Sequence, residues 1–300
     1  MNLEQLQSFR AVAEHGSFSR AAAVRFLAQP TVSMQVAALE RELGARLFDR
    51  LGWRVVLTDA GTEFLQYTVR ILSLVEESRR AMAEIQGIAA GQLVVGASQT
   101  IGNYIVPRHF GTFTARYPGV RLVLEILPIP AIAERIREGS LDLGMIEAPI
   151  VASDLLTRPF LTDELVLIVP QGHPWSELGV VEAQDLARER FIARDPESLS
   201  GRIVRERLSA LGVEVVPTLQ VGTPEAVRES VRAGLGVGIV SRHVVTLALA
   251  AGVVAEVPVR GLRVERNLRV VLHKQKHVSR ALAAFLQILG LDPEELAAST

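Results

Sequence analysis

The chain has 300 residues, of which 49% are hydrophobic and 22% charged, and its formal net charge is −1. This size favours about two domains, with enough apolar residues for a substantial core. The absence of cysteine excludes disulfide frameworks, zinc–thiolate sites and thiol nucleophiles. The amphipathic N-terminus is unlike a signal peptide, and no run approaches the roughly 18 apolar residues of a membrane span, so we expect a cytoplasmic protein without membrane contact.

The first residues predict two short helices. Apolar residues recur at helical spacing over 3–14, and Gly16 ends this helix. Ser17 is a favourable N-cap for a second helix over 18–25. Residues 1–58 carry seven arginines against five acidic residues, which is consistent with a mildly basic N-terminal module.

A third helix follows the turn at 26–29. An apolar stripe is expected to face inward, formed by Val32, Val36, Leu39 and Leu43. The opposite face carries small and hydrogen-bonding side chains, namely Pro30, Thr31, Met34 and Ala38, flanked by Ser33 and Gln35. Such a face suits the major groove of DNA. The alternative is a plain three-helix bundle whose surface is made of small residues.

Two short strands are predicted next, at Leu47–Phe48 and Val55–Leu57. The turn between them contains Gly52 and is flanked by Arg50 and Arg54. Arginines at the tip of such a wing are placed to contact phosphates or a minor groove. Exposed arginines are otherwise ordinary solvated charges.

These residues together resemble the winged helix-turn-helix of LysR-type transcriptional regulators. The matching motifs are Gly16-Ser17-Phe18, Ala21-Ala22, Gln29-Pro30-x-Val32-Ser33, Leu39-Glu40-x-x-Leu43-Gly44, Leu47-Phe48-x-Arg50 and Leu57-Thr58-x-Ala60-Gly61. The resemblance implies sequence-specific binding of double-stranded DNA. The DNA-binding residues it implies are Ser17, Gln29, Pro30, Thr31, Ser33, Met34, Gln35, Arg50 and Arg54. Ala28 departs from the Ser or Thr that caps the third helix in the family.

A long helix is predicted after Gly61. Its heptad-like positions are Phe64, Thr68, Ile71, Val75, Ser78, Met82 and Ile85. Two interpretations stay open: packing on its own domain, or pairing with a second copy of the chain. The family uses this helix for dimerisation, so the resemblance implies a homo-oligomer, a tetramer built as a dimer of dimers.

Residues 85–92 form a Gly/Ala-rich hinge, and strands then alternate with helices. The predicted strands are 93–98, 120–127, 141–147, 163–170, 190–194, 218–222, 237–241 and 268–274. The predicted helices are 103–116, 130–139, 200–211, 224–233 and 278–289. Such alternation is typical of α/β folds with parallel sheets covered on both faces.

The family resemblance continues in Gly139-x-Leu141-Asp142, His173-Pro174 and Ala233-Gly234-Leu235-Gly236-x-Gly238. It implies a regulatory domain of two Rossmann-like subdomains, hinged like periplasmic binding proteins, with a small-molecule inducer in the cleft. RNA polymerase is a further partner we expect. The run at 98–107 is similar to regulators of carbon-fixation and sulfur-assimilation genes.

The predicted domains are a winged helix-turn-helix over 1–59, a linker helix over 60–88 and an effector domain over 92–300. Within the effector domain, subdomain 1 covers 92–162 with 265–290, and subdomain 2 covers 163–264.

Several polar residues stand where predicted strands feed helices, which is where open α/β sheets bind ligands. The candidate effector residues are Ser98, Thr100, Glu147, Arg194, Ser198, Ser200 and Thr223. Hydroxyls and an arginine favour an anion, whereas Glu147 would oppose one. The hydroxyls are equally suited to cap helices.

Enzyme motifs are incomplete. Gly96–Thr100 lacks the final glycine of G-x-S-x-G, Gly234–Gly238 fails G-x-G-x-x-G, and the six histidines have no metal-ligand spacing. We therefore expect no catalytic activity, no metal and no cofactor. A solute-binding protein without a DNA role is the alternative, although it would not need the first sixty residues.

Overall fold

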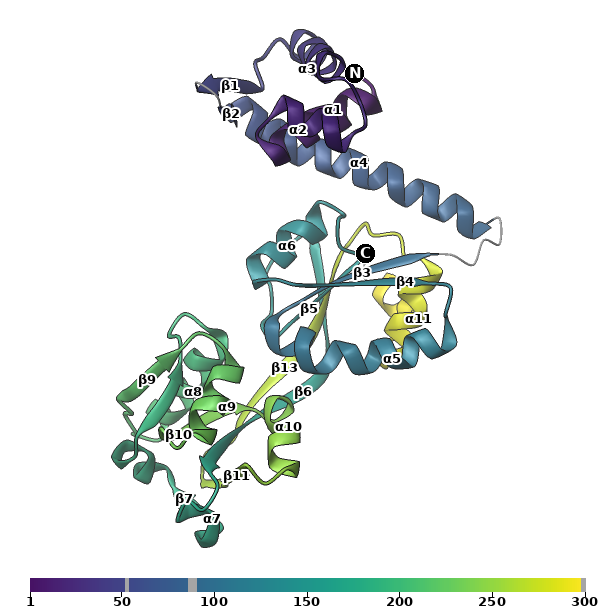
Figure 1. Cartoon of the computed structure of the whole chain (residues 1–300). Coiled ribbons are helices and arrows are strands. Elements are labelled where there is room, and N and C mark those ends of the chain that lie inside the picture. The colour runs from purple at the N-terminus through teal and green to yellow at the C-terminus, as the bar shows by residue number, and fades with distance from the viewer. Residues whose placement is uncertain (52–53, 86–90, 298–300) are drawn as a thin grey trace.

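The computed structural model describes residues 1–51, 54–85 and 91–297. Its N-terminal domain consists of three helices and a strand pair (Figure 1). The helices are α1 (Leu3–His15), α2 (Phe18–Val24) and α3 (Gln29–Leu43), and the antiparallel strands are β1 (Phe48–Leu51) and β2 (Arg54–Leu57). Both strands are longer than predicted, and the turn with Gly52 lies outside the described residues.

The long helix α4 (Asp59–Ile85) belongs in its first half to the N-terminal core. The Phe64 ring lies 5.3 Å from that of Phe9, Thr68 is fully buried, and Ile71 and Leu72 pack against the same cluster. The first half of the predicted pairing seam is therefore wrong, because this side of the helix completes the core of its own domain. Residues 86–88 of the predicted linker and most of the hinge lie outside the described part of the chain.

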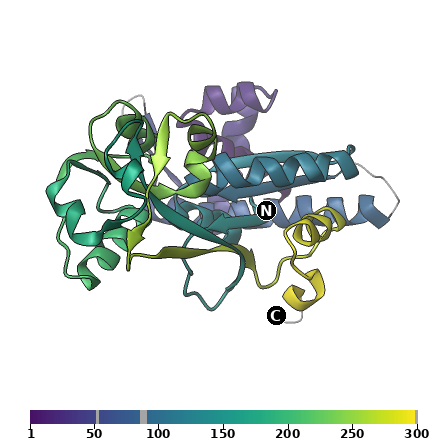
Figure 2. The same cartoon turned by 90° about the horizontal axis from the view of Figure 1, so that it is seen from below.

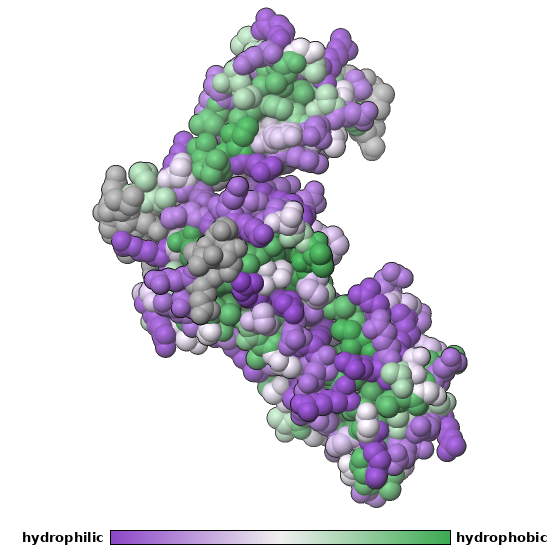
Figure 3. Space-filling view, turned by 180° about the vertical axis from the view of Figure 1, so that it is seen from behind, coloured by the Kyte–Doolittle hydropathy of each residue, from purple (hydrophilic) through white to green (hydrophobic). Residues whose placement is uncertain are grey.

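A different side of α4 is exposed and apolar. Tyr67, Leu74 and Met82 are 51%, 66% and 55% exposed, and Ser78 lies between the last two on the same side. Figure 3 shows an apolar patch on the N-terminal part of the molecule, seen from behind. Spacings of seven and eight residues keep these side chains in one stripe along the helix.

The remainder of the chain forms two α/β subdomains. Subdomain 1 contains β3 (Gln92–Ala97), β4 (Arg121–Ile126), β5 (Leu143–Ile146), a π-helical turn η1 (Ile101–Ile105), α5 (Val106–Arg116), α6 (Ile129–Arg137) and α11 (Arg280–Ile288). Subdomain 2 contains β8 (Phe191–Arg194), β9 (Pro217–Val221), β10 (Val237–Ser241), β11 (Val254–Glu256), α8 (Leu199–Ala210), α9 (Pro224–Arg232) and α10 (Arg242–Ala250). Shorter elements are α7 (Trp175–Leu178), β7 (Val181–Glu182), η2 (Ala183–Arg188), β12 (Val259–Arg260) and α12 (Pro293–Ala297).

Two long strands join the subdomains, β6 (Leu155–Pro170) and β13 (Val264–His273). They pair antiparallel over their length, from Leu155 opposite His273 to Leu165 opposite Val264 (Figure 2). They stand at the centre of one sheet with the strand order β4-β3-β5-β13-β6-β10-β8-β9, and β11 pairs with β6. The sheet is therefore mixed, and the prediction of parallel sheets holds only for its outer strands. The outer strands of each subdomain are parallel, but the central pair reverses because each strand carries the chain across the boundary.

Helices cover both faces of each half of the sheet, as predicted. In subdomain 1, α5 and α11 pack on one apolar cluster and α6 packs on another. In subdomain 2, α8 covers one face, while α9 and α10 cover the other. Helix α10 and the first half of β6 were not predicted from the sequence.

Candidate DNA-binding surface and effector cleft

Helix α3 is fixed by its apolar stripe. Val32, Val36 and Leu39 are at most 2% exposed, as predicted. Leu43 was expected to face inward but is 40% exposed, because it is the last residue of the helix, next to Gly44. Ala28 forms no side-chain cap, so the first backbone N–H groups of α3 have no capping acceptor from that side chain.

The outward face of α3 begins at its first turn. Pro30 and Met34 are exposed, the latter by 65%, while Thr31 and Ser33 are half-buried. The Nε2 of Gln29 donates to the Oγ of Ser33 over 2.8 Å. This bond holds two hydrogen-bonding side chains together one turn apart on the predicted DNA-reading face.

Two other predicted DNA-binding residues make internal contacts. Ser17 caps α2 by accepting from the N–H of Arg20. Gln35 accepts from the hydroxyl of buried Ser8, which in turn accepts from Arg25 over 2.6 Å. Gln35 therefore connects α3 to α1, and any contact it makes with DNA stays a prediction.

The wing strands place Arg50 opposite Val55 and Leu51 opposite Arg54. The backbone of both arginines is within the described chain, whereas their side chains are not. Their predicted phosphate contacts therefore stay predictions.

We predict that Ser33→Ala reduces sequence discrimination more than general DNA affinity. The variant removes a hydroxyl from the reading face and frees the Gln29 amide, and one good base contact contributes about 1–3 kcal/mol of discrimination. Binding of a duplex selected by the wild-type chain, measured against a scrambled duplex, checks this. Equal losses on both duplexes would contradict it.

The ends of β3 and β8 bring several predicted effector residues to the boundary between the subdomains. Ser98 and Thr100, which follow β3, are 6% and 4% exposed. The Oγ of Ser98 is buried and finds no hydrogen-bond partner among the described residues. A buried polar atom without a partner costs free energy unless a ligand or water satisfies it.

Arg194, at the end of β8, also carries a buried polar atom without a partner in the described chain. Its Nε is buried and has no hydrogen-bond partner within the described chain. Burial lowers the pKa of the Arg194 guanidinium, the Glu225 carboxylate opposes this shift, and the charges of Arg266 and Glu147 also act on it. The structure thus brings Arg194 within the electrostatic reach of Glu147.

Arg266, on β13, is a buried cation that the sequence analysis missed. Its side chain is 5% exposed, its Nε donates to Asp163 over 2.8 Å, and its Nη1 lies 3.8 Å from Glu147. Asp163 is fully buried and also accepts from the hydroxyl of Ser241 over 2.7 Å. Because Asp163 and Arg266 lie on β6 and β13, this network fastens the two crossing strands.

A second contact across the boundary involves the π-helical turn. Gln99 and Asn103 donate to the carboxylate of Glu225, at the start of α9, over 3.3 and 3.0 Å. Arg228 lies 3.4 Å from the hydroxyl of Tyr104. π-Helical turns are rare and are found mostly at functional sites. Here the turn carries side chains of subdomain 1 onto α9 of subdomain 2.

The remaining predicted hydroxyls serve local structure. Ser198 caps α8, accepting from the N–H of Gly201 over 3.1 Å, and Thr223 caps α9 in the same way through Ala226. The capping alternative therefore describes these two side chains. Ser200 lies on the first turn of α8 and lines a cavity within subdomain 2.

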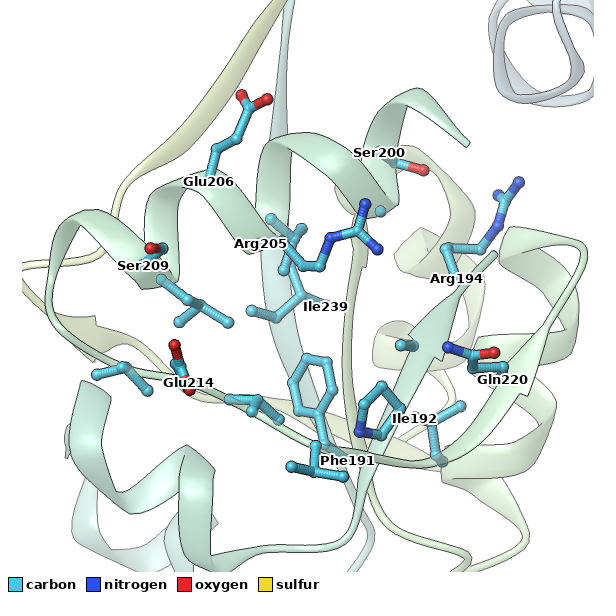
Figure 4. A pocket seen from close by; sticks show the side chains of 18 of the residues that line it. Phe191, Ile192, Arg194, Ser200, Arg205, Glu206, Ser209, Glu214, Gln220 and Ile239 are labelled. Atoms are coloured by element: carbon cyan, nitrogen blue, oxygen red, sulfur yellow. The ribbon is translucent and has the colours of Figure 1, made fainter. Parts of the chain in front are cut away.

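That cavity has a volume of about 800 Å³ and lies between α8 and the strands β8 and β9 (Figure 4). Its wall is mostly apolar and includes Phe191, Ile192 and Ile239, with Arg205 and Gln220 among its polar groups. Arg194 lies at its edge, and its guanidinium points away from Phe191 and Ile192. The residues that line this cavity include Arg194 and Ser200 but neither Ser98 nor Thr100.

Within the described ranges, no group of three or more His, Asp or Glu side chains is arranged to hold a metal ion. In the same part of the chain, no helix combines the length and apolar character needed to cross a membrane.

A winged helix-turn-helix joined by a long helix to a two-subdomain α/β module is the architecture of a DNA-binding transcriptional regulator. The chain matches the description "Bacterial regulatory helix-turn-helix protein, lysR family" over residues 3–62 and "LysR substrate binding domain" over residues 86–291. It therefore belongs to the LysR family of transcriptional regulators, as the resemblance indicated, and the predicted fold class is confirmed.

Relatives and solved structures agree with this assignment. The chain is 35% identical to a "Probable RuBisCO transcriptional regulator" of Porphyra purpurea, covering 95% of this chain and 92% of that protein. It is 34% identical to the protein of the same name from Synechocystis, covering 99% and 90%. Full-length OxyR from Pseudomonas aeruginosa has a TM-score of 0.75 at 25% identity, covering 98% and 96%. CbnR, a LysR family regulator, shares the fold with a TM-score of 0.72 at 23% identity, covering 99% of each chain.

Proposed function

We propose that a small anion bound between the subdomains controls DNA binding by this regulator. The observation that carries the proposal is the pair of buried, unpartnered polar atoms at this boundary, Ser98 Oγ and Arg194 Nε. An anionic group satisfies both, because a hydroxyl and a guanidinium are both donors to it. Thr100, two residues after Ser98, adds a further buried hydroxyl.

The carboxylate of Glu147 favours an effector that carries a hydrogen-bond donor as well as an anionic group. Arg266 contacts both carboxylates, Asp163 at 2.8 Å and Glu147 at 3.8 Å, so its closer contact is with Asp163. Glu147 therefore keeps acceptor capacity, and an effector with a hydroxyl or ammonium group next to its anionic group complements both ends.

On the DNA side, we propose that Gln29, Pro30, Thr31, Ser33 and Met34 contact bases in the major groove. The arginines of the wing contact the backbone. Support comes from the exposed first turns of α3 and from the general rule that the N-terminal residues of a recognition helix read base edges.

The assembly we propose is a dimer of dimers. The exposed stripe of Tyr67, Leu74 and Met82 pairs with the same stripe of a second chain. A contact surface that matches itself generates a two-fold symmetric dimer, which suits an operator with two half-sites. Activation would then involve RNA polymerase as a further partner.

The name shared by the curated relatives indicates which DNA to test first. We propose that the regulated genes include those of RuBisCO. Selection of genomic fragments by the full-length chain, followed by sequencing, tests this. Enrichment that omits the RuBisCO promoter would contradict it.

A thermal-shift screen of metabolites tests the effector proposal, and we predict that its hits are acids. Ser98→Ala should then lower the affinity for the strongest hit about tenfold or more, since hydrogen bonds to charged groups contribute about 1.5–3 kcal/mol. The melting temperature without ligand should not fall, because the lost hydroxyl has no hydrogen-bond partner among the residues that the structure describes. Thr100→Val should weaken binding similarly.

Calorimetry with that hit measures the affinities. Thr112→Val, an exposed threonine on α5, is the control and should bind as the wild type does. Neutral or cationic hits, or unchanged binding by Ser98→Ala and Thr100→Val, would overturn the anion proposal.

A further inference from the structure

The turn of the helix-turn-helix contains an unusual residue. Helix α2 ends with the N–H of Phe26 donating to Ala23 over 3.2 Å and the N–H of Leu27 donating to Ala22 over 2.9 Å. This pair of bonds is the Schellman motif, whose central position adopts the left-handed conformation and is usually glycine. Phe26 occupies that position with φ = 55°.

The same chain shows what the motif ordinarily requires. Within the described residues, five other helices end with the same two bonds, and each has a glycine with φ between 65° and 76° at the position of Phe26. These residues are Gly139, Gly212, Gly234, Gly252 and Gly290. Phe26 is the one non-glycine residue with positive φ in the described chain.

Packing in the core does not explain why a phenylalanine occupies position 26. Its side chain is 95% exposed, so it contributes nothing to the core, whereas its neighbour Leu27 packs against the N-terminal cluster. The position thus combines a backbone conformation unfavourable for a bulky residue with a fully exposed ring. A strained residue that stabilises nothing in its own chain points to an intermolecular contact.

The surroundings of Phe26 favour DNA as the partner. Phe26 stands two residues before Ala28, the N-cap of α3. It therefore lies at the N-terminal end of α3, where the exposed Pro30 is also found. Residues 15–39 contain no Asp or Glu, so no carboxylate in this segment opposes a phosphate.

We propose that the ring of Phe26 packs against the sugar–phosphate wall of the major groove and so positions α3. Because Phe26 precedes the recognition helix, its contact is with the backbone and not with bases. The contact is apolar and neutralises no phosphate, so it contributes equally on every sequence and leaves the salt dependence unchanged.

The test replaces Phe26 with asparagine, which tolerates the left-handed conformation. Phe26→Asn should raise the melting temperature of the full-length protein by about 2–4 °C and lower DNA affinity by about tenfold. The probes are a duplex enriched by the wild-type chain from a random library and a scrambled duplex, with affinities measured by fluorescence anisotropy at several salt concentrations. Both affinities should fall by the same factor with an unchanged salt slope, and Phe26→Tyr should retain wild-type affinity.

Gly252→Phe is the matched control, since a Cβ there meets nothing within 4 Å. It places the same residue in the same motif on α10 and should lower the melting temperature without changing DNA affinity. Unchanged DNA binding by Phe26→Asn overturns the proposal and assigns the ring to a protein partner. A loss confined to the selected duplex also overturns it, because the contact would then be to bases. Failure of the wild-type chain to enrich any duplex would instead count against sequence-specific recognition by α3.

Discussion

Replacing Leu74 with aspartate is expected to separate the paired linker helices and release monomers. Leu74 is 66% exposed at the centre of the apolar stripe of α4, so two carboxylates would face each other at the proposed two-fold axis. A dimer gains affinity for two half-sites through effective concentration, and losing this should weaken operator binding by about 10²- to 10⁴-fold. Sedimentation velocity and anisotropy on a two-half-site duplex measure the two effects.

Thr62→Asp introduces the same charge on the same helix. Thr62 is exposed on another side of α4, away from the stripe, so this control should leave the oligomer and the DNA affinity unchanged. If the Leu74→Asp variant keeps the wild-type oligomer, α4 does not form the interface. A substitution of Ile71 is a poorer test, because that side chain also packs in its own domain.

The second large effect is expected at the centre of the regulatory domain. Arg266→Met should lower the free energy of unfolding by about 3–5 kcal/mol, because it leaves Asp163 and Glu147 buried without their cation. Urea denaturation followed by circular dichroism measures this. The double variant Arg266→Met with Asp163→Asn should recover part of the loss.

Arg242→Met is the control for the removal of an ion-paired arginine. Arg242 contacts two carboxylates, Glu164 at 2.9 Å and Glu256 at 2.6 Å, but its side chain is 47% exposed. Solvent screens such pairs, so the loss should be under about 1 kcal/mol. Equal losses in the free energy of unfolding for the two variants would show that burial does not determine how much Arg266 stabilises the fold.

The helices of the N-terminal domain were predictable because their apolar spacing is local. Val32, Val36 and Leu39 recur at helical intervals, and a helix can bury all three only on one side. The polar residues after β3 and β8 were also predictable, since chain direction places strand ends at one edge of a parallel sheet. In the structure Ser98 follows β3 and Arg194 ends β8, while their role in binding stays a proposal.

For other residues the sequence pattern indicates burial but does not identify the partner of the buried group. Arg266 stands between Val264 and Leu268 in a strand of alternating burial, so its position in the buried phase was visible. Its partner Asp163 is 103 residues away and could not be found from spacing. The same holds for Glu225, whose partners Gln99 and Asn103 lie just before and on the π-helical turn of the other subdomain.

The amino-acid sequence by itself determined the family, the winged helix-turn-helix and the succession of strands and helices, because motifs and periodicity act over a few residues. Tertiary structure decided which side of α4 is free, since the core of the first domain covers Phe64 and Thr68 and leaves Leu74 exposed. It also decided that β6 and β13 cross between subdomains, and that the hydroxyls of Ser198 and Thr223 cap helices while that of Ser98 finds no partner in the described part of the chain. These outcomes depend on which distant segments pack together, and local spacing carries no information about that.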